Sequence, residues 1–306
     1  MGYKFNFNRV NRQVIQASFS LCLSLAVLTA FASGNQSDKK KTVSGAASKN
    51  LVVNSDASQG IANWKNVETI LKKGGPDKAR YFEVENSTSV NSLEFISVDA
   101  TSQYQLSAMI KSGNDKINNV YVGLYQFDEN KKMIASTAVS PVEQTETTLE
   151  GNVAKGESVV RVKDASNWEP VFWEKRLTIV FDVDDSGEYK DLPNPKFYTV
   201  EKLVKKDGYW EATLAKPLAS NFKSGIKVRA HLLSGQYMYV FNAKKNFPEW
   251  TKVEGTIEPV VKSGAPRSTF WPGTKYVQVL VLANLGQKDG EVLQFTNISL
   301  EKVDTK

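Results

Sequence analysis

Few side chains in this sequence carry the chemistry that a catalytic site needs. An enzyme requires a group that exchanges protons near neutral pH or an activated nucleophile. His231 is the only histidine of the 306 residues, and Cys22, the only cysteine, lies in an apolar N-terminal run. We expect His231 to be a half-exposed strand residue. No histidine-based metal triad is visible in the sequence.

Pairs of carboxylates would be the alternative, because a glycosidase holds two of them across a cleft. Glu83, Glu85, Glu94 and Asp99 lie on predicted strands. Their pattern does not differ from that of solvent-facing charges. An enzyme is therefore the least favoured interpretation of this chain.

The densest acidic run, DVDDSGEYKDLPN, begins like a calcium-binding loop. Asp182, Asp184, Ser186 and Gly187 occupy the first, third, fifth and sixth places of that motif. The twelfth place, which needs a bidentate Glu, is Pro193. We therefore expect a solvated acidic turn between two strands.

Aromatic residues are better candidates for a binding site, because the apolar faces of sugar rings stack on Tyr and Trp. In NNVYVGLYQF, the residues Tyr121, Gly123 and Tyr125 share one strand face, and the glycine would leave a shallow floor. In KYVQVLVLAN, Tyr276 and Gln278 also share a face.

The run YQLSAMIKS places Gln105, Met109 and Lys111 opposite an apolar strand face. A sheet face that combines these residues with Tyr121, Tyr125 and Gln278 would form a polar groove with aromatic walls. The same pattern also fits a half-wet outer surface. Both interpretations remain open at this point.

Two further segments place aromatic residues side by side. RSTFWPGTKYV contains Trp271, and NWEPVFW contains Trp173. Adjacent exposed aromatics need a partner, which is either the core or a ligand. Trp271 and Trp173 therefore complete the candidate carbohydrate-binding residues.

The elements that must position these residues are predicted strands. Period-two runs of aromatic and β-branched residues recur between turn clusters, and no convincing amphipathic helix is visible. Residues 50–144 and 235–306 read as two halves of one sandwich. Residues 145–234 have a different pattern of short strands, with Asp-Gly at 207–208 suited to a tight hairpin. They predict a small β-domain inserted into a surface loop, which tolerates such insertions.

The N-terminal segment predicts export. Residues 1–32 combine Lys4, Arg9 and Arg12 with an apolar run that ends in Ala-Phe-Ala, as in a secretory signal peptide. A polar, Lys-rich flexible linker follows over 33–49. The mature chain would have no transmembrane span and no cysteine, and it would be secreted or held at the cell surface.

Charge argues against nucleic acid as a partner. Without the three N-terminal cations, the 39 Lys and Arg residues fall to 36, against 33 Asp and Glu. The remaining cations are scattered among acids and form no basic stripe with interleaved aromatics.

The outer halves resemble the galactose-binding-like jelly-roll fold of secreted carbohydrate-binding modules that bind xylan or β-glucan. The resemblance lies in the order and spacing of LVVNSDASQGIANW, ISVDATSQYQLSAMIKS, NNVYVGLYQFDENKKMI, WTKVEGTI, KYVQVLVLAN and LQFTNISLEKV. It implies a jelly-roll β-sandwich and non-catalytic binding of a polysaccharide or oligosaccharide.

Modules of that type often hold a structural calcium between the first and last strands. The motif acids are replaced here by Ser58 and Thr296, and Asp56 is the remaining carboxylate. Calcium takes six to eight oxygen ligands, usually with carboxylates among them. The resemblance therefore leaves a weak calcium site at Asp56 open and implies no other cofactor.

The segment 145–234 resembles a small β-module of bacterial and phage surface proteins. Gly156, Val160, Val162 and Trp168 match its strand and its Trp-containing turn. This resemblance implies no enzymatic activity. The alternative function is a structural or adhesion protein of the cell envelope, which would bind a protein partner through the sandwich.

Overall fold

The computed structural model describes residues 49–67, 72–261 and 268–303. The predicted signal peptide and nearly all of the predicted linker lie outside these residues. The regular structure of the described chain is almost entirely β, so the predicted all-β class is confirmed. The helical segments are single turns, namely η1 (Pro76–Lys78), η2 (Ser136–Val139), η3 (Ser166–Trp168) and α1 (Glu169–Trp173).

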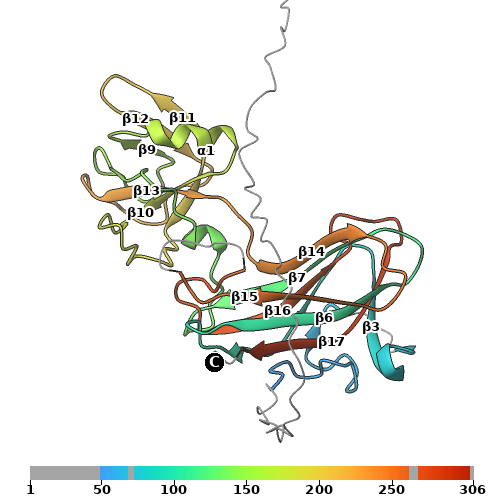
Figure 1. The fold of residues 1–306 in the computed structure, drawn as a ribbon. Coiled ribbons are helices and arrows are strands. Elements are labelled where there is room, and N and C mark those ends of the chain that lie inside the picture. The colour runs from blue at the N-terminus through green and yellow to red at the C-terminus, as the bar shows by residue number, and fades with distance from the viewer. Residues whose placement is uncertain (1–48, 68–71, 262–267, 304–306) are drawn as a thin grey trace, which may run out of the picture. The chain divides into compact units, whose positions relative to one another are not determined.

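Two antiparallel sheets form a β-sandwich (Figure 1). Sheet one contains, in spatial order, β1 (Trp64–Lys65), β4 (Thr88–Ser92), β16 (Tyr276–Ala283), β7 (Asn118–Phe127) and β14 (Met238–Lys245), and β5 (Ile96–Ser97) also pairs with β16. Sheet two contains β15 (Thr251–Ile257), β6 (Tyr104–Ser112), β17 (Val292–Lys302), β3 (Arg80–Glu85) and β2 (Lys72–Lys73). Both sheets pair strands from before residue 128 with strands from after residue 237.

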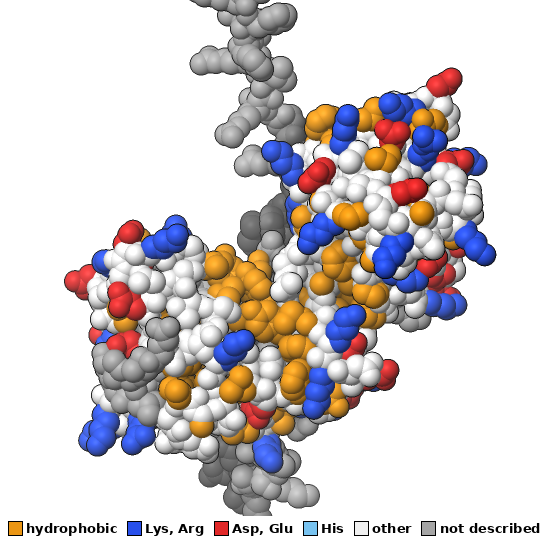
Figure 2. Space-filling view, turned by 180° about the vertical axis from the view of Figure 1, so that it is seen from behind, with side chains coloured by type: hydrophobic (Ala, Val, Ile, Leu, Met, Phe, Trp, Pro, Cys, Tyr) orange, Lys and Arg blue, Asp and Glu red, His pale blue; other side chains and the backbone are white. Residues whose placement is uncertain are grey.

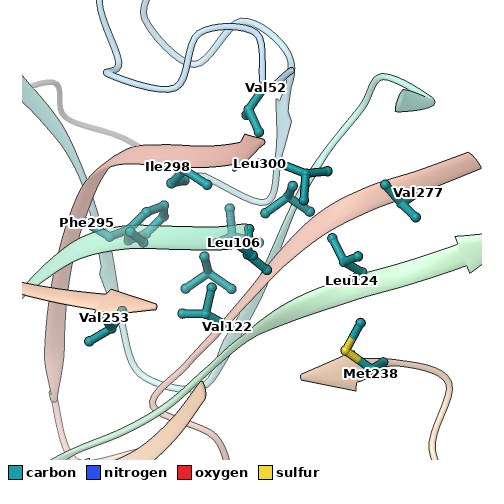
Figure 3. Close-up of a cluster of buried hydrophobic side chains, with 14 of the residues drawn as sticks. Val52, Leu106, Val122, Leu124, Met238, Val253, Val277, Phe295, Ile298 and Leu300 are labelled. Atoms are coloured by element: carbon teal, nitrogen blue, oxygen red, sulfur yellow. The ribbon is translucent and has the colours of Figure 1, made fainter. Parts of the chain in front are cut away.

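Strand alternation builds the core between these two sheets. Tyr104, Leu106, Ala108 and Ile110 of β6 are buried, and the residues that alternate with them are only partly covered. Figure 3 shows Leu106 and Phe295 of sheet two among the same buried side chains as Val122, Leu124 and Val277 of sheet one. Burial of large apolar side chains supplies most of the stability of such a sandwich.

A third sheet has its own core. Its strands, in spatial order, are β8 (Thr147–Thr148), β13 (Lys227–Leu232), β10 (Leu177–Phe181), β11 (Phe197–Lys205), β12 (Trp210–Leu214) and β9 (Val159–Val162). The bridge between Leu149 and Val162 brings its two ends together, so the sheet is a nearly closed barrel. All five residues of β10 are buried, as expected for a central strand.

The buried residues of the sandwich and those of the third sheet form two separate clusters. One cluster of buried residues runs from Val52 to Val139 and resumes at Met238, and the other runs from Leu149 to Ala230. We keep 145–234 as the proposed inserted domain.

Candidate functional site

The outward face of sheet one carries the strongest group of candidate residues. Val120, Val122 and Leu124 of β7 point into the core, so the alternate residues Tyr121 and Tyr125 point outward. Gln278 of β16 pairs with Tyr125, and Leu282 pairs with Tyr121. The structure therefore brings three of the predicted residues together, namely Tyr121, Tyr125 and Gln278.

Two tyrosines that the sequence reading missed join this face. Tyr121 and Tyr239 meet edge to face, with ring centroids 5.1 Å apart, and Tyr237 lies 6.3 Å from Tyr239. Burial, and then the neighbouring Tyr121, Tyr239 and Tyr125, raises the pKa of Tyr237. All four rings are partly exposed. The run QYMYVFN could have indicated them, because Tyr237 and Tyr239 are two residues apart and so lie on the same side of an extended segment.

The floor between these rings is apolar. Leu280 and Leu282 alternate with core residues of β16, yet they are only 1% and 6% exposed on the outward side. The expectation that Gly123 leaves a shallow floor between the two tyrosines is wrong. A Cβ atom there would lie 2.0 Å from the Met238 carbonyl oxygen, because the bulged strand β14 passes over the glycine.

Uncharged polar groups lie along the same face. The Ser89 and Tyr125 hydroxyls are 3.3 Å apart, and Asn91 Nδ2 donates to Gln278 Oε1 at 3.4 Å. Gln278 Nε2 donates to the carbonyl of Leu93 at 3.0 Å. We call the set Tyr121, Tyr125, Tyr237, Tyr239, Ser89, Asn91 and Gln278 the tyrosine face. It offers aromatic surface together with hydroxyl and amide groups, and its members carry no charge.

The structure does not bring the other predicted strand residues to this face. Gln105, Met109 and Lys111 lie on β6 of sheet two, opposite its core-facing residues. Gln105 Oε1 accepts a hydrogen bond from Thr256 of the neighbouring β15 at 3.3 Å. The expected single groove is therefore split between the outer surfaces of two different sheets. Sequence alternation identifies the outward residues but does not identify the sheet.

The two tryptophan candidates have opposite environments. Trp271 is 2% exposed and belongs to the sandwich core, and its backbone N–H donates to Gln126 Oε1 at 2.9 Å. Trp271 is therefore covered by the core and is not available to a ligand. Trp173 is 74% exposed at the end of α1, with the Phe172 ring 5.5 Å away.

The predicted calcium position is organised by side-chain hydrogen bonds. Asp56 Oδ1 accepts from the Ser58 N–H at 3.0 Å, and its hydrogen bonds with Ser58 lower the pKa of Asp56. Thr296 is buried and donates to the Arg80 carbonyl at 2.9 Å. Within the described residues, no group of three or more His, Cys, Asp or Glu side chains converges. These residues do not match the carboxylate-rich ligand set that calcium prefers.

His231 is not the half-exposed residue that its sequence context predicts. It is fully buried, with Nδ1 2.7 Å from the Thr137 carbonyl and Nε2 3.2 Å from Arg229 Nε. Nδ1 therefore carries the proton, and Nε2 accepts from the guanidinium. Burial lowers the pKa of His231 to about 4. The hydrogen bond with Thr137 partly opposes this shift, and the positive charge of Arg229 adds to it.

The acidic run at 182–194 does more than form a solvated turn. Asp191 pairs with the fully buried Arg229 at 3.1 Å, and the Asp184 carbonyl accepts from the same guanidinium at 3.3 Å. The Tyr189 ring lies 4.8 Å from the guanidinium carbon. We call Arg229, His231, Asp191 and Tyr189 the arginine cluster. Arg229 is hydrogen-bonded to both His231 and Asp191, which is typical of a structural role.

A hollow of about 330 Å³ adjoins the tyrosine face and shares Tyr237 and Tyr239 with it. Its other polar lining residues are Ser136, Ser140, Ser234 and Arg176. Figure 2 shows one side of the molecule, where hydrophobic side chains form a broad orange patch with charged side chains mostly around it. Tyrosines are coloured with the hydrophobic residues in this view.

Comparison with known proteins leaves the family open. No known protein family matches the sequence, and no curated protein matches it either. One solved structure with some similarity is described as "a putative sugar binding protein" from Bacteroides thetaiotaomicron. The match has a TM-score of 0.33 and 13% identity, and it covers 83% of this chain and 100% of that chain. The described residues include no helix that is both long and apolar enough to cross a membrane.

Proposed function

We propose that this chain is a secreted, non-catalytic protein that binds a polysaccharide through the tyrosine face. The observation that carries the proposal is the grouping of four partly exposed tyrosines over a buried leucine floor, with amide and hydroxyl groups between them. Secretion rests on the N-terminal sequence, which lies outside the described residues.

The chemistry of the face suits a sugar chain. Pyranose rings present apolar C–H surfaces that stack on aromatic rings, and their hydroxyls need donors and acceptors at the rim. Tyr121 and Tyr125 supply rings, and Asn91 and Gln278 supply amide groups. Because the tyrosine face carries no charge, the stretch of glycan that lies on it should be uncharged.

The same set of residues supports a non-catalytic role. Glycoside hydrolysis needs two carboxylates set across the bond that breaks. The tyrosine face contains none, and Glu94 and Asp99 are engaged elsewhere, with the Val53 N–H and with Thr101, Ser102 and Lys302. Binding of a sugar chain is therefore better supported than cleavage.

Affinity electrophoresis in soluble xylan and β-glucan tests the proposal. The native chain should be retarded, and Tyr121→Ala or Tyr125→Ala should reduce retardation severalfold to about tenfold, since one stacked ring contributes roughly 0.5 to 1.5 kcal/mol. Met109→Ala, on the outer surface of sheet two, is the matched control and should bind normally. An absence of retardation of the native chain by every polysaccharide would sink the proposal.

A second candidate is binding of an envelope protein, which the exposed apolar side chains at one end of sheet one favour. Leu93 is 50% exposed and Phe95 is 36% exposed, and the Phe95 ring lies 4.9 Å from that of Phe127. Exposed apolar groups of this kind are typical of protein contacts. Capture of one stoichiometric envelope protein, lost in Leu93→Ser, would support this function instead.

A further inference from the structure

The hollow beside the tyrosine face is built on fixed backbone. Leu232 N–H donates to the Ser140 carbonyl at 2.9 Å, and Leu233 N–H donates to the Arg176 carbonyl at 2.6 Å. The Ser136 and Ser234 hydroxyls are hydrogen-bonded to each other. These bonds join three segments that are distant in the sequence, so the position of Arg176 relative to the serines is set by the fold.

Among the described residues that line the hollow, Arg176 is the only charged one. Its Nε donates to the Leu233 carbonyl at 3.2 Å, which orients the guanidinium. Within the described part of the chain, its two terminal nitrogens have no hydrogen bond or ion pair. They form an oriented pair of donors without an acid beside them in the lining.

A guanidinium with two free parallel N–H groups matches a carboxylate, which it binds through two hydrogen bonds. The tyrosines shared by the hollow and the tyrosine face provide a continuous surface for a sugar chain. A chain that lies on the face would bring its next residue or its branch into the hollow. The hydroxyls of Ser136, Ser140 and Ser234 are suited to the hydroxyls of that residue.

We propose that the hollow binds an acidic sugar residue, whose carboxylate pairs with Arg176, within a glycan held by the tyrosine face. This inference rests on the proposed function and extends it to a substrate class, namely polysaccharides that carry uronic acid residues. The tyrosine face binds the neutral part of the chain, and Arg176 adds a preference for the acidic part.

Matched pairs of polysaccharides test this preference on the full chain. One pair is xylan with glucuronic acid branches and the same xylan after reduction of its carboxyl groups to alcohols. The other is soluble β-glucan and the same β-glucan with part of its C6 alcohols oxidised to carboxylates. The native chain should bind the acidic member of a pair roughly five- to tenfold more tightly, because charge-assisted hydrogen bonds exceed neutral ones in strength. The preference should shrink as salt rises.

Arg176→Gln should remove the preference while leaving binding of the neutral member unchanged. Lys175→Gln is the control, because it removes the same charge from the adjacent exposed residue, which does not line the hollow. Equal binding of both members by the native chain, or a preference that survives in Arg176→Gln, would overturn the inference and leave the proposed function intact. If the native chain binds none of the four polysaccharides, both the inference and the proposed function are overturned.

Discussion

The tyrosine face and the arginine cluster both gather polar side chains from distant segments, but they differ in exposure and in how their hydrogen bonds are satisfied. Arg229 and His231 are fully buried and bond each other, Asp191 and the Thr137 carbonyl. Tyr121 and Tyr125 are partly exposed, and among the described residues the Tyr125 hydroxyl has one hydrogen-bond partner, the Ser89 hydroxyl 3.3 Å away.

The difference separates a structural site from a binding site. A buried polar group without a partner costs about 1 to 3 kcal/mol, so the hydrogen bonds among Arg229, His231 and Asp191 stabilise one conformation and occupy the buried donors. The partly exposed groups of the tyrosine face can exchange water for a ligand. Disruption of the first should therefore reduce stability, and disruption of the second should reduce binding.

The largest expected effect comes from breaking the buried ion pair. Arg229→Met leaves Asp191, whose side chain is only 9% exposed, without its partner. Loss of one member of a buried pair should lower the free energy of unfolding by roughly 3 to 5 kcal/mol, seen as a large fall in melting temperature. Arg161→Met, at an exposed arginine of the same sheet, is the control and should cost under about 1 kcal/mol. A melt of Arg229→Met that matches the control would contradict the structural role.

The next effect is a pH dependence of stability. The pKa of His231 is about 4 in the folded chain against an ordinary 6.5, so the unfolded chain binds the proton more readily. His231 therefore contributes stability that is fully present above pH 6.5 and is lost as the pH falls toward 4, on the order of 3 kcal/mol in all.

Denaturant melts between pH 7 and pH 4 measure this loss. His231→Gln removes the titrating group, so its stability should change less over that range than the stability of the native chain. If the unfolding free energies of the native chain and His231→Gln change equally with pH, then the pKa of His231 is not lowered by burial.

A deletion tests whether the two regions are independent. Replacement of residues 145–234 with a short Gly-Ser bridge removes the core around Trp168 and Phe181. It keeps the buried residues of the sandwich cluster and removes the partly buried Leu192 that packs against them. The shortened chain should melt cooperatively and should retain binding to neutral polysaccharide. Aggregation without a cooperative melt would count against the proposed boundaries.

A smaller effect on stability is expected at the tyrosine face. Tyr121→Ala should weaken polysaccharide binding severalfold to about tenfold, yet it should lower stability by less than the 3 to 5 kcal/mol typical of a fully buried aromatic. A thermal melt measures the effect on stability, and a binding assay on the same variant measures the effect on affinity. A strongly destabilised variant with full affinity per folded molecule would assign Tyr121 to packing.

The smallest effect is expected from chelation. Because Ser58 and Thr296 replace the motif acids, excess chelator should barely shift the melting temperature. A large fall on chelation, reversed by added calcium, would show that Asp56 and other oxygens hold an ion.

The all-β class and the outward direction of Tyr121, Tyr125 and Gln278 could be predicted from the sequence, because both depend on period-two alternation within single strands. It also indicated the change of pattern near residue 145. These features are local, and each can be recognised within a window of about ten residues.

Which outward residues share a surface could not be predicted in this way, because it depends on how remote strands pair. Gln105, Met109 and Lys111 alternate as regularly as the tyrosines, but β6 belongs to sheet two. Tyr239 of β14, and Tyr237 just before that strand, join the face from more than a hundred residues along the chain. Burial of His231 and Trp271 was likewise decided by contacts with distant segments, at the Thr137 carbonyl and at Gln126. Strand pairing between remote segments depends on the total burial of the folded chain, which no single strand encodes.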